Sequence, residues 1–194
     1  MALLFGYLLG SVPFGLVLTR LTGAGDLRAI GSGNIGATNV LRTGNKGLAA
    51  ATLLLDVAKG YLAVTLAPLF GASPADAMPL AAIGAFVGHC YPVWLKFNGG
   101  KGVATLLGIA VAFGWIYLAV FAAIWLGIVA IFRISSLGGM SAALALPVTA
   151  IFQNNSQQMF LFAGLALLVL WKHRSNIGRL IRGEEPKVGA SKNE

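Results

Sequence analysis

The stretch GSGNIGATN at residues 31–39 combines glycines with short polar side chains, a composition typical of loops that bind phosphate. Gly31, Gly33 and Gly36 read G-x-G-x-x-G, and Asp56 follows 20 positions after the last of them. A dinucleotide-binding turn with this pattern must follow a buried strand and open a helix. Two charged residues and no convincing strand precede it here, and Asp56 lies in a membrane-length apolar run. The context therefore argues against a nucleotide-binding fold.

Anion binding remains the better interpretation of this first glycine-rich loop. Glycines let backbone N–H groups approach an anion closely, and a helix N-terminus attracts negative charge. Arg42 follows, and its guanidinium suits bidentate contact with phosphate. A turn that only joins two helices would not need so many polar side chains. The predicted phosphate-binding residues are Ser32, Gly33, Asn34, Thr38, Asn39 and Arg42.

A second glycine-rich loop, FNGGKGVAT at residues 97–105, repeats this chemistry. Its spacing is not that of a Walker A loop, because Leu95 occupies the position of the first glycine. It can still form a backbone cradle with the Lys101 ammonium as a point charge. The alternative is a basic loop that only sets topology. The predicted phosphate-binding residues are Asn98, Gly99, Gly100 and Gly102, with Lys101 as a catalytic residue.

The segment WKHRSNIGRLIRGEEPK at residues 171–187 supplies a third group of candidates. His173 and Asn176 are three residues apart, so they share a face if the helix continues through them. A histidine can orient or deprotonate a hydroxyl because its pKa lies near neutrality. Basic residues after a membrane span also anchor helices to anionic headgroups, and that alternative stays open here.

Four further residues are weaker candidates. Asp56 and Lys59 lie three residues apart within a span, where ionisable groups are functional candidates by default and a structural ion pair is the alternative. His89 lies toward the inner end of its span, as either a supporting or a structural histidine. The small residues at 135–147 predict tight helix contact, although Ser141 is included as a phosphate-binding candidate. The sequence holds no Cys/His cluster, so we expect no metal, and it contains neither a G-x-S-x-G elbow nor an H-x-x-x-x-D pair.

Composition places these groups in a membrane protein. Hydrophobic residues make up 57% of the 194 residues and charged residues 10%, against about 25% charged in soluble domains. The first 19 residues carry no charged side chain, and without a basic start they predict a retained span rather than a cleaved signal. The net charge of +8 in such a chain reports topology, and no nucleic-acid partner is expected.

The apolar runs predict an all-α integral membrane protein with about seven transmembrane helices. The runs cover residues 1–19, 47–70, 78–95, 102–132 and 134–171. The two longest divide at Gly114 and at the polar QNNSQQ of residues 153–158. Five or six spans with re-entrant pieces are the alternative.

The basic residues indicate an orientation. With seven spans, 13 of the 14 fall in segments on one side, and only Lys59 lies within a span. The positive-inside rule makes that side cytoplasmic, with the N-terminus outside and the C-terminus inside. We expect one polytopic domain over residues 1–194. Its cytoplasmic segments lie at about residues 22–46, 96–104, 133–141 and 172–187.

Three stretches together carry a resemblance to a known family: GSGNIGATNVLRTGNKG, GHCYPVWLKFNGGKGVAT and HRSNIGRLIRGEEPK. In this order, and between membrane spans, they resemble the bacterial acyl-phosphate-dependent glycerol-3-phosphate acyltransferases, the PlsY family. The resemblance extends over essentially the whole chain. It implies an enzyme that needs no cofactor and lies in the bacterial inner membrane with its active site facing the cytoplasm.

The resemblance implies transfer of a long-chain acyl group from acyl phosphate to the 1-hydroxyl of sn-glycerol 3-phosphate. The products are 1-acylglycerol 3-phosphate and phosphate, in bacterial phospholipid synthesis. The expected partners are the two substrates, membrane lipid and a soluble enzyme that forms acyl phosphate and hands it over. Direct attack without an acyl-enzyme, assisted by substrate phosphate, suits so activated a donor, with Lys101, His173 and Asn176 as catalytic residues.

A transporter for a phosphorylated solute is the main alternative, because the intramembrane Asp56 and Lys59 would suit one. Transporters often contain internal repeats with broken helices at the membrane midplane. The only internal echo here is GAT at residues 36–38 and VAT at residues 103–105, and both are expected at the surface. A lipid-binding scaffold is a third hypothesis, but it would not need two glycine-rich loops.

Overall fold

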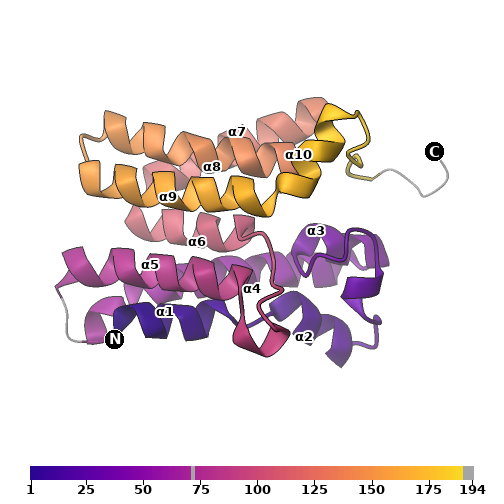
Figure 1. The fold of residues 1–194 in the computed structure, drawn as a ribbon, viewed down its shortest axis with the longest axis horizontal. Helices are drawn as coiled ribbons and strands as arrows, with labels where there is room; N and C mark the ends of the chain where they lie inside the picture. Colours follow the sequence, from indigo (N-terminus) through magenta and orange to yellow (C-terminus); the bar gives the residue numbers. More distant parts are fainter. Residues whose placement is uncertain (71–72, 190–194) are drawn as a thin grey trace. The chain divides into compact units, whose positions relative to one another are not determined.

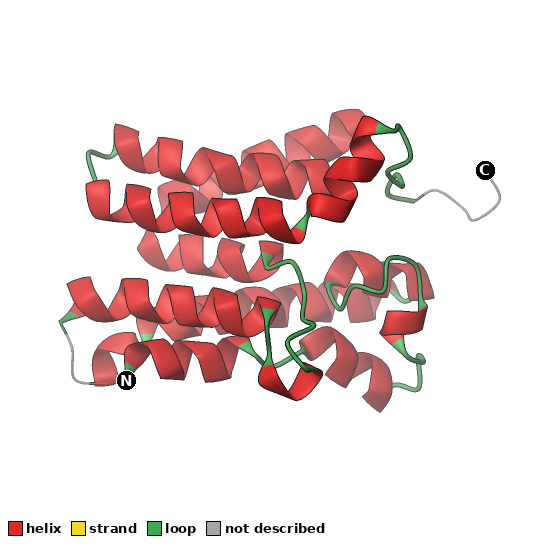
Figure 2. Cartoon of the chain, viewed as in Figure 1, coloured by secondary structure: helices red, strands yellow, loops and turns green. Residues whose placement is uncertain are grey.

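Every regular element that the structure describes is a helix, as the sequence predicts (Figures 1 and 2). The computed structural model describes residues 1–70 and 73–189. These residues pack into two compact units, with the boundary along the chain between Phe113 and Gly114. The single domain over residues 1–194 stays a prediction, and residues 190–194 lie outside the described part of the chain.

The first unit contains the glycine-rich loops. Its α-helices are α1 (Ala2–Gly10), α2 (Phe14–Leu21), α3 (Ala37–Val40), α4 (Lys46–Thr65), α5 (Pro74–Cys90) and α6 (Val103–Phe113). Short 3-10 helices connect them: η1 (Leu27–Ala29), η2 (Leu41–Thr43), η3 (Ala67–Phe70) and η4 (Val93–Leu95). The second unit is formed by α7 (Trp115–Phe132), α8 (Ser135–Phe152), α9 (Ser156–Lys172) and α10 (Arg174–Ile181).

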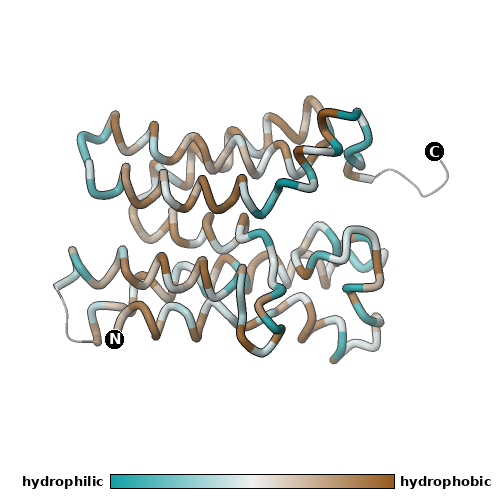
Figure 3. Tube along the Cα trace, viewed as in Figure 1, coloured by the Kyte–Doolittle hydropathy of each residue, from teal (hydrophilic) through white to brown (hydrophobic). Residues whose placement is uncertain are grey.

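Five helical stretches among the described residues are long and apolar enough to cross a membrane. They are Ala2–Leu21, Lys46–Thr65, Pro74–Leu95, Trp115–Phe132 and Ser135–Phe152. The helices α6 and α9 are apolar but shorter. Figure 3 shows hydrophobic residues along the helices and hydrophilic residues gathered at helix ends and connections. The protein is therefore a multi-pass membrane protein, while seven spans and their orientation stay predictions.

The helix breaks confirm two expectations, and a further break lies within the first span. Gly114, with φ 147°, separates α6 from α7, and the QNNSQQ segment separates α8 from α9. The span predicted at residues 1–19 corresponds to the apolar stretch Ala2–Leu21, within which α1 ends at Gly10 and α2 begins at Phe14. Pro13 lies in this break, where its ring removes a backbone donor that a helix would need.

Glycines bring the helices of the first unit into backbone contact. On α1, a Cβ added at Gly6 or Gly10 would overlap the backbone of α5. On α5, a Cβ at Gly84 or Gly88 would in turn overlap the backbone of α1. This reciprocal small-residue packing is the usual way in which helices associate where lipid offers no hydrophobic driving force. It holds the start of the chain against the helix that leads into the second glycine-rich loop.

The helices α4 and α6 approach each other in the same manner. A Cβ at Gly60 of α4 would overlap the Thr105 backbone, and a Cβ at Gly108 of α6 would overlap the Val57 backbone. In the second unit, α8 packs against both α7 and α9, and Gly138 of α8 lies against Trp125 of α7. Because α6 begins directly after the second glycine-rich loop, its contact with α4 fixes where that loop ends.

We predict that Gly108→Ala weakens the first unit, because the new methyl group must push α6 away from the α4 backbone. The expected loss is about 1–3 kcal/mol in the free energy of unfolding, as for overpacking in a close-packed interior. Thermal unfolding of the purified protein in detergent measures it. Gly47→Ala is the matched control, because its Cβ would meet only ordinary contact. Equal melting temperatures for the two variants would contradict the packing argument.

Candidate active site

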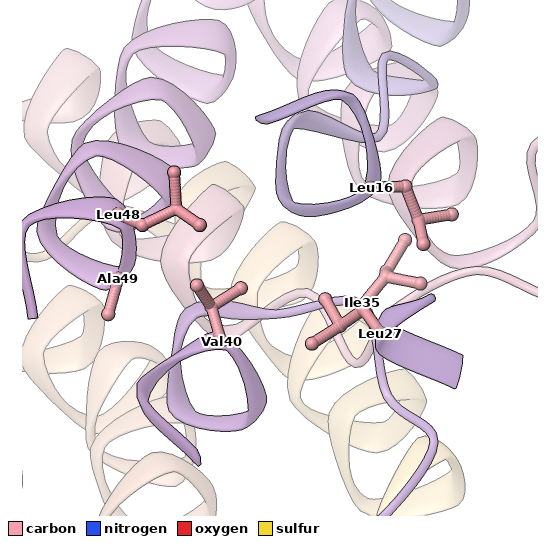
Figure 4. Close-up of a cluster of buried hydrophobic side chains, with 6 residues drawn as sticks. All are labelled: Leu16, Leu27, Ile35, Val40, Leu48 and Ala49. Atoms are coloured by element: carbon pink, nitrogen blue, oxygen red, sulfur yellow. The ribbon is translucent and has the colours of Figure 1, made fainter. Parts of the chain in front are cut away.

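The first glycine-rich loop lies within the segment between α2 and α4, and this segment packs on a cluster of buried apolar side chains (Figure 4). The segment supplies Leu27, Ile35 and Val40, and the flanking helices supply Leu16, Leu48 and Ala49. Leu27 and Val40 are fully buried. Burial of these side chains holds an otherwise irregular segment against the ends of two helices, so its polar groups have a defined place.

Asn39 organises the backbone of this loop. Its Nδ2 donates to the carbonyl oxygens of Leu27, Ile30 and Asn34 at 2.8–2.9 Å. Its Oδ1 accepts a hydrogen bond from the Ser32 backbone N–H at 3.2 Å. The side chain is buried and its polar atoms are engaged within the loop. The structure thus gives Asn39 a positioning role, where the sequence suggested direct contact with phosphate.

Arg42 lies across the glycines of the same loop. Gly31 has φ 55°, in the left-handed region, and a Cβ there would overlap the Arg42 side chain and the Asn39 amide. Arg42 is exposed, and within the described chain no acidic or hydrogen-bonding group engages its guanidinium. The Arg42 side chain therefore packs against the bare backbone of Gly31. The predicted residues Ser32 and Thr38 are exposed nearby in the chain.

Arg28, the other arginine of this loop, is occupied. It forms an ion pair with Asp26, with Nη2 and Oδ2 3.1 Å apart. Hydrogen bonds from the Arg28 side chain and backbone lower the pKa of Asp26. The two arginines therefore differ in their partners, since Arg28 is paired with Asp26 in a local turn and Arg42 is exposed to solvent.

The second glycine-rich loop is folded back onto the end of α5. The N–H groups of Gly99 and Gly100 donate to the carbonyl oxygens of Cys90 and His89, at 3.2 and 3.0 Å. A Cβ at Gly100 would overlap the His89 ring. These two N–H groups are thus engaged within the chain, and the glycines serve close packing. Lys101 and the first turn of α6 follow directly.

The segment that leads into the second loop packs against the apolar cluster that supports the first. Leu95, just before the second loop, packs against the cluster that supports the first. The indole of Trp94 donates to the Ser11 carbonyl at 2.8 Å, and the Tyr7 hydroxyl donates to the Tyr91 carbonyl at 2.9 Å. The two predicted phosphate-binding loops therefore lie at one end of the first unit, although about 60 residues separate them in the sequence.

The intramembrane ion pair that the sequence left open as an alternative is present. The Nζ of Lys59 lies 2.7 Å from Oδ1 of Asp56, and both side chains are buried. The same ammonium donates to the Val12 carbonyl at 2.7 Å. On its other side, Asp56 Oδ1 lies 3.8 Å from Nδ1 of His89. Pairing lowers the cost of keeping charged groups within a membrane.

His173 marks a bend between two helices, and the helix does not continue through it. His173 is both the C-cap residue of α9 and the N-cap residue of α10, with φ −98° and ψ 8°. Its Nδ1 lies 2.8 Å from the Val169 carbonyl oxygen, which can only accept, so Nδ1 carries the hydrogen. In the neutral ring Nε2 is then the nitrogen able to accept a proton.

Glu185 is the residue that the sequence argument missed. Its Oε1 accepts hydrogen bonds from Ser136 of α8, at 2.6 Å, and from the Asn176 amide. Its Oε2 accepts from Nε of Arg179 at 2.7 Å. Burial acts to raise the pKa of Glu185, but these donors outweigh it and hold the pKa below its ordinary value. The sequence offered one indication of this role, because Glu184 and Glu185 directly follow a segment rich in arginine.

Two features of the second unit stay outside this cluster. Ser141 is half-buried on α8, more than one turn beyond Ser136, and its phosphate role stays a prediction. A shallow hollow at the α8–α9 turn is lined by Ile151, Asn154, Asn155, Ser156 and Met159. It contains none of the predicted site residues and lies at the end of α8 that is remote from Ser136.

The fold and the loops define a multi-pass helical membrane protein whose polar loops have the residue types of a phosphate site. The family model described as glycerol-3-phosphate acyltransferase matches residues 1–183. The chain belongs to this family and is an acyltransferase, which confirms the resemblance seen in its three motifs. The transporter and scaffold hypotheses are excluded as its principal function.

Relatives and solved structures agree with this assignment. A glycerol-3-phosphate acyltransferase from Mesorhizobium japonicum is 56% identical over 190 residues, covering 98% of this chain and 96% of its own. The relative of that name from Brucella ovis is 54% identical over 189 residues, covering 97% and 92%. The crystal structure of PlsY (YgiH), an integral membrane glycerol 3-phosphate acyltransferase in its glycerol 3-phosphate form, matches with TM-score 0.90 and 34% identity, covering 97% of this chain and 94% of that one. Its lysophosphatidic acid form matches with TM-score 0.88 and 33% identity, covering 96% and 93%.

We predict that Glu185→Gln destabilises the second unit near neutral pH and not in acid. The folded-state pKa is lowered, so the carboxylate stabilises the fold above the unfolded value of about 4.3. That contribution is lost as the pH falls through the lowered pKa. Loss of a charged hydrogen-bond acceptor should cost on the order of 1 kcal/mol at pH 7. Melting temperatures measured across pH test this.

Glu184→Gln is the control for that experiment. Glu184 pairs with Arg182, and both side chains are more than half exposed. A surface pair of this kind contributes little to stability. A pH-independent effect of Glu185→Gln, or an equal effect of Glu184→Gln, would show that the hydrogen-bonded carboxylate is not what stabilises this segment.

Proposed function

We propose that the protein transfers a long-chain acyl group from acyl phosphate to the 1-hydroxyl of sn-glycerol 3-phosphate, giving lysophosphatidic acid and phosphate. The observation that carries the proposal is that the first glycine-rich loop and the segment leading into the second pack on one apolar cluster. Both substrates carry a phosphate, and the acyl chain needs an apolar environment such as the membrane helices supply. The glycerol 3-phosphate and lysophosphatidic acid forms of the PlsY structures support the acceptor and the product.

The chemistry needs no covalent enzyme intermediate. An acyl phosphate is a mixed anhydride, so the glycerol hydroxyl can attack its carbonyl carbon directly. The new ester C–O bond forms as the bond from the carbonyl carbon to the phosphate oxygen breaks. Phosphate leaves with the electron pair of that bond, and the hydroxyl proton passes to a phosphate oxygen of a substrate. Catalysis then consists of positioning and of stabilising the charge that develops.

The basic residues of the loops bind the phosphates in this proposal. Arg42 supplies a guanidinium that can contact two phosphate oxygens, and the exposed Ser32 hydroxyl adds a donor beside it. Lys101 adds a point charge at the start of α6. The other proposed contributors are Gly33, Asn34, Thr38, Asn98, Gly102 and Ser141.

His173 and Asn176 align the reacting groups. With the hydrogen on Nδ1, the His173 ring can accept a hydrogen bond from the attacking hydroxyl at Nε2. Asn176 is held by Glu185, which fixes its amide for the donor carbonyl. Neither residue has to take the proton permanently, because the substrate phosphates can.

The proposed setting is the bacterial inner membrane, with seven spans, the N-terminus outside and the active site facing the cytoplasm. There acyl phosphate formed by a soluble enzyme can be handed over, with membrane lipid surrounding the helices. The distribution of 13 of the 14 basic residues supports this orientation.

We expect the purified protein to form 1-acylglycerol 3-phosphate from palmitoyl phosphate and glycerol 3-phosphate, with one phosphate released per ester. Mass spectrometry of the lipid and a phosphate assay measure both products. Palmitoyl-CoA and palmitoyl-acyl carrier protein serve as competing donors. Turnover with either of these and none with palmitoyl phosphate would overturn the donor assignment.

We expect Arg42→Ala to lower kcat/KM by about 100-fold, as for loss of one charged group that stabilises the transition state. Arg28→Ala is the matched control, since it removes an arginine of the same loop that is already paired with Asp26. It should change kcat/KM by less than about twofold. Near-normal kinetics of a folded Arg42→Ala enzyme would remove this loop from phosphate binding.

A further inference from the structure

Three buried ionisable residues lie beneath the second glycine-rich loop, and the proposed reaction gives them no direct part. Asp56 and Lys59 come from α4 and His89 from α5, with exposed fractions of 2%, 2% and 4%. Charged groups in a membrane interior are costly, and a buried ion pair adds little net stability compared with apolar side chains. Their arrangement therefore needs a reason other than stability.

One end of the cluster holds the break between α1 and α2. The Lys59 ammonium donates to the Val12 carbonyl at 2.7 Å, and it lies 5.6 Å from the centre of the Phe14 ring. A helix break within the membrane leaves backbone carbonyls that the helix no longer satisfies. Lys59 therefore ties α4 to the segment at which α2 departs toward the first glycine-rich loop.

The other end of the cluster reaches the second loop. Asp56 Oδ1 lies 2.7 Å from the Lys59 ammonium and 3.8 Å from Nδ1 of the His89 ring, and the second distance is too long for a hydrogen bond. The far side of that ring lies so close to Gly100 that a Cβ there would overlap its Nε2. The His89 carbonyl also accepts the Gly100 N–H. Gly100 is the residue before Lys101.

We propose that Asp56, Lys59 and His89 are positioning residues for Lys101. The Asp56 carboxylate, held by Lys59, faces Nδ1 of the His89 ring, and the opposite side of the ring packs against Gly100. The backbone that carries the Lys101 ammonium is thereby set at a fixed depth relative to the start of α6. This inference rests on the proposed function, which assigns Lys101 to a substrate phosphate.

A double-mutant analysis with Lys101 distinguishes a positioning role from general structural damage. Residues that act only through Lys101 lose their effect once its ammonium is gone, whereas independent damage adds. The variants are His89→Leu and the charge-free pair Asp56→Asn with Lys59→Met, each made with Lys101 intact and with Lys101→Ala. Lys101→Arg supplies a second, milder background with measurable turnover.

We expect His89→Leu and the charge-free pair each to lower kcat/KM by about tenfold with Lys101 intact, mainly through KM. With Lys101 replaced, the further loss should be less than about twofold. His89→Gln, which keeps a polar group facing Asp56, should retain more activity than His89→Leu. Melting temperature and size-exclusion profile in detergent establish that each variant is folded.

Thr52→Val is the matched control, because Thr52 is buried on α4 one turn before Asp56 and bonds only its own helix. It should leave kcat/KM unchanged in both backgrounds. Equal losses from His89→Leu with and without Lys101, or no loss in folded variants with Lys101 intact, would overturn the positioning inference alone. A folded Lys101→Ala enzyme with normal kinetics would instead overturn the role that the proposed function gives Lys101.

Discussion

Contact between backbones and their neighbours at glycine positions determines where the functional side chains of the first unit lie. Gly84 and Gly88 set α5 against α1, and Gly108 sets α6 against α4. The same device recurs in the loops, where Gly31 lies against Arg42 and Gly100 lies against His89. A methyl group at any of these positions would overlap the neighbouring atoms and push the two segments apart. The glycines therefore help to determine where the nearby charged side chains lie.

Polar groups complete this placement where apolar packing cannot. Asn39 ties together three carbonyl oxygens of an irregular loop, and Lys59 satisfies the carbonyl at a helix break. Glu185 accepts hydrogen bonds from Ser136 of α8 and from Asn176 and Arg179 of α10. Each of these side chains forms hydrogen bonds with groups from separate segments of the chain. Such side chains favour one arrangement of the segments, because a buried polar group without a hydrogen-bond partner costs free energy.

The sequence was sufficient for features that depend on neighbouring residues. The break at Gly114, the polar turn at residues 153–158 and the Asp56–Lys59 pair all follow from local spacing. The role of Asn39 could not be predicted, because its acceptors lie 5, 9 and 12 residues away along an irregular loop. The hydrogen bonds of the Gly99 and Gly100 N–H groups likewise could not be predicted, because they depend on the second loop folding back onto the end of α5. The break before Phe14 was predictable from Pro13.

The Glu185 contacts have a consequence for shortened forms of the protein. Glu185 follows every α-helix that the structure describes, and it joins α8 to Asn176 and Arg179. Beyond it, the backbone N–H of Val188 donates to the Arg133 carbonyl at 2.6 Å. A chain terminated after Ile181 would keep all the hydrophobic helices needed for insertion and would lack these ties. The apolar stretches that can enter the membrane and the carboxylate that holds Asn176 thus lie in different parts of the sequence.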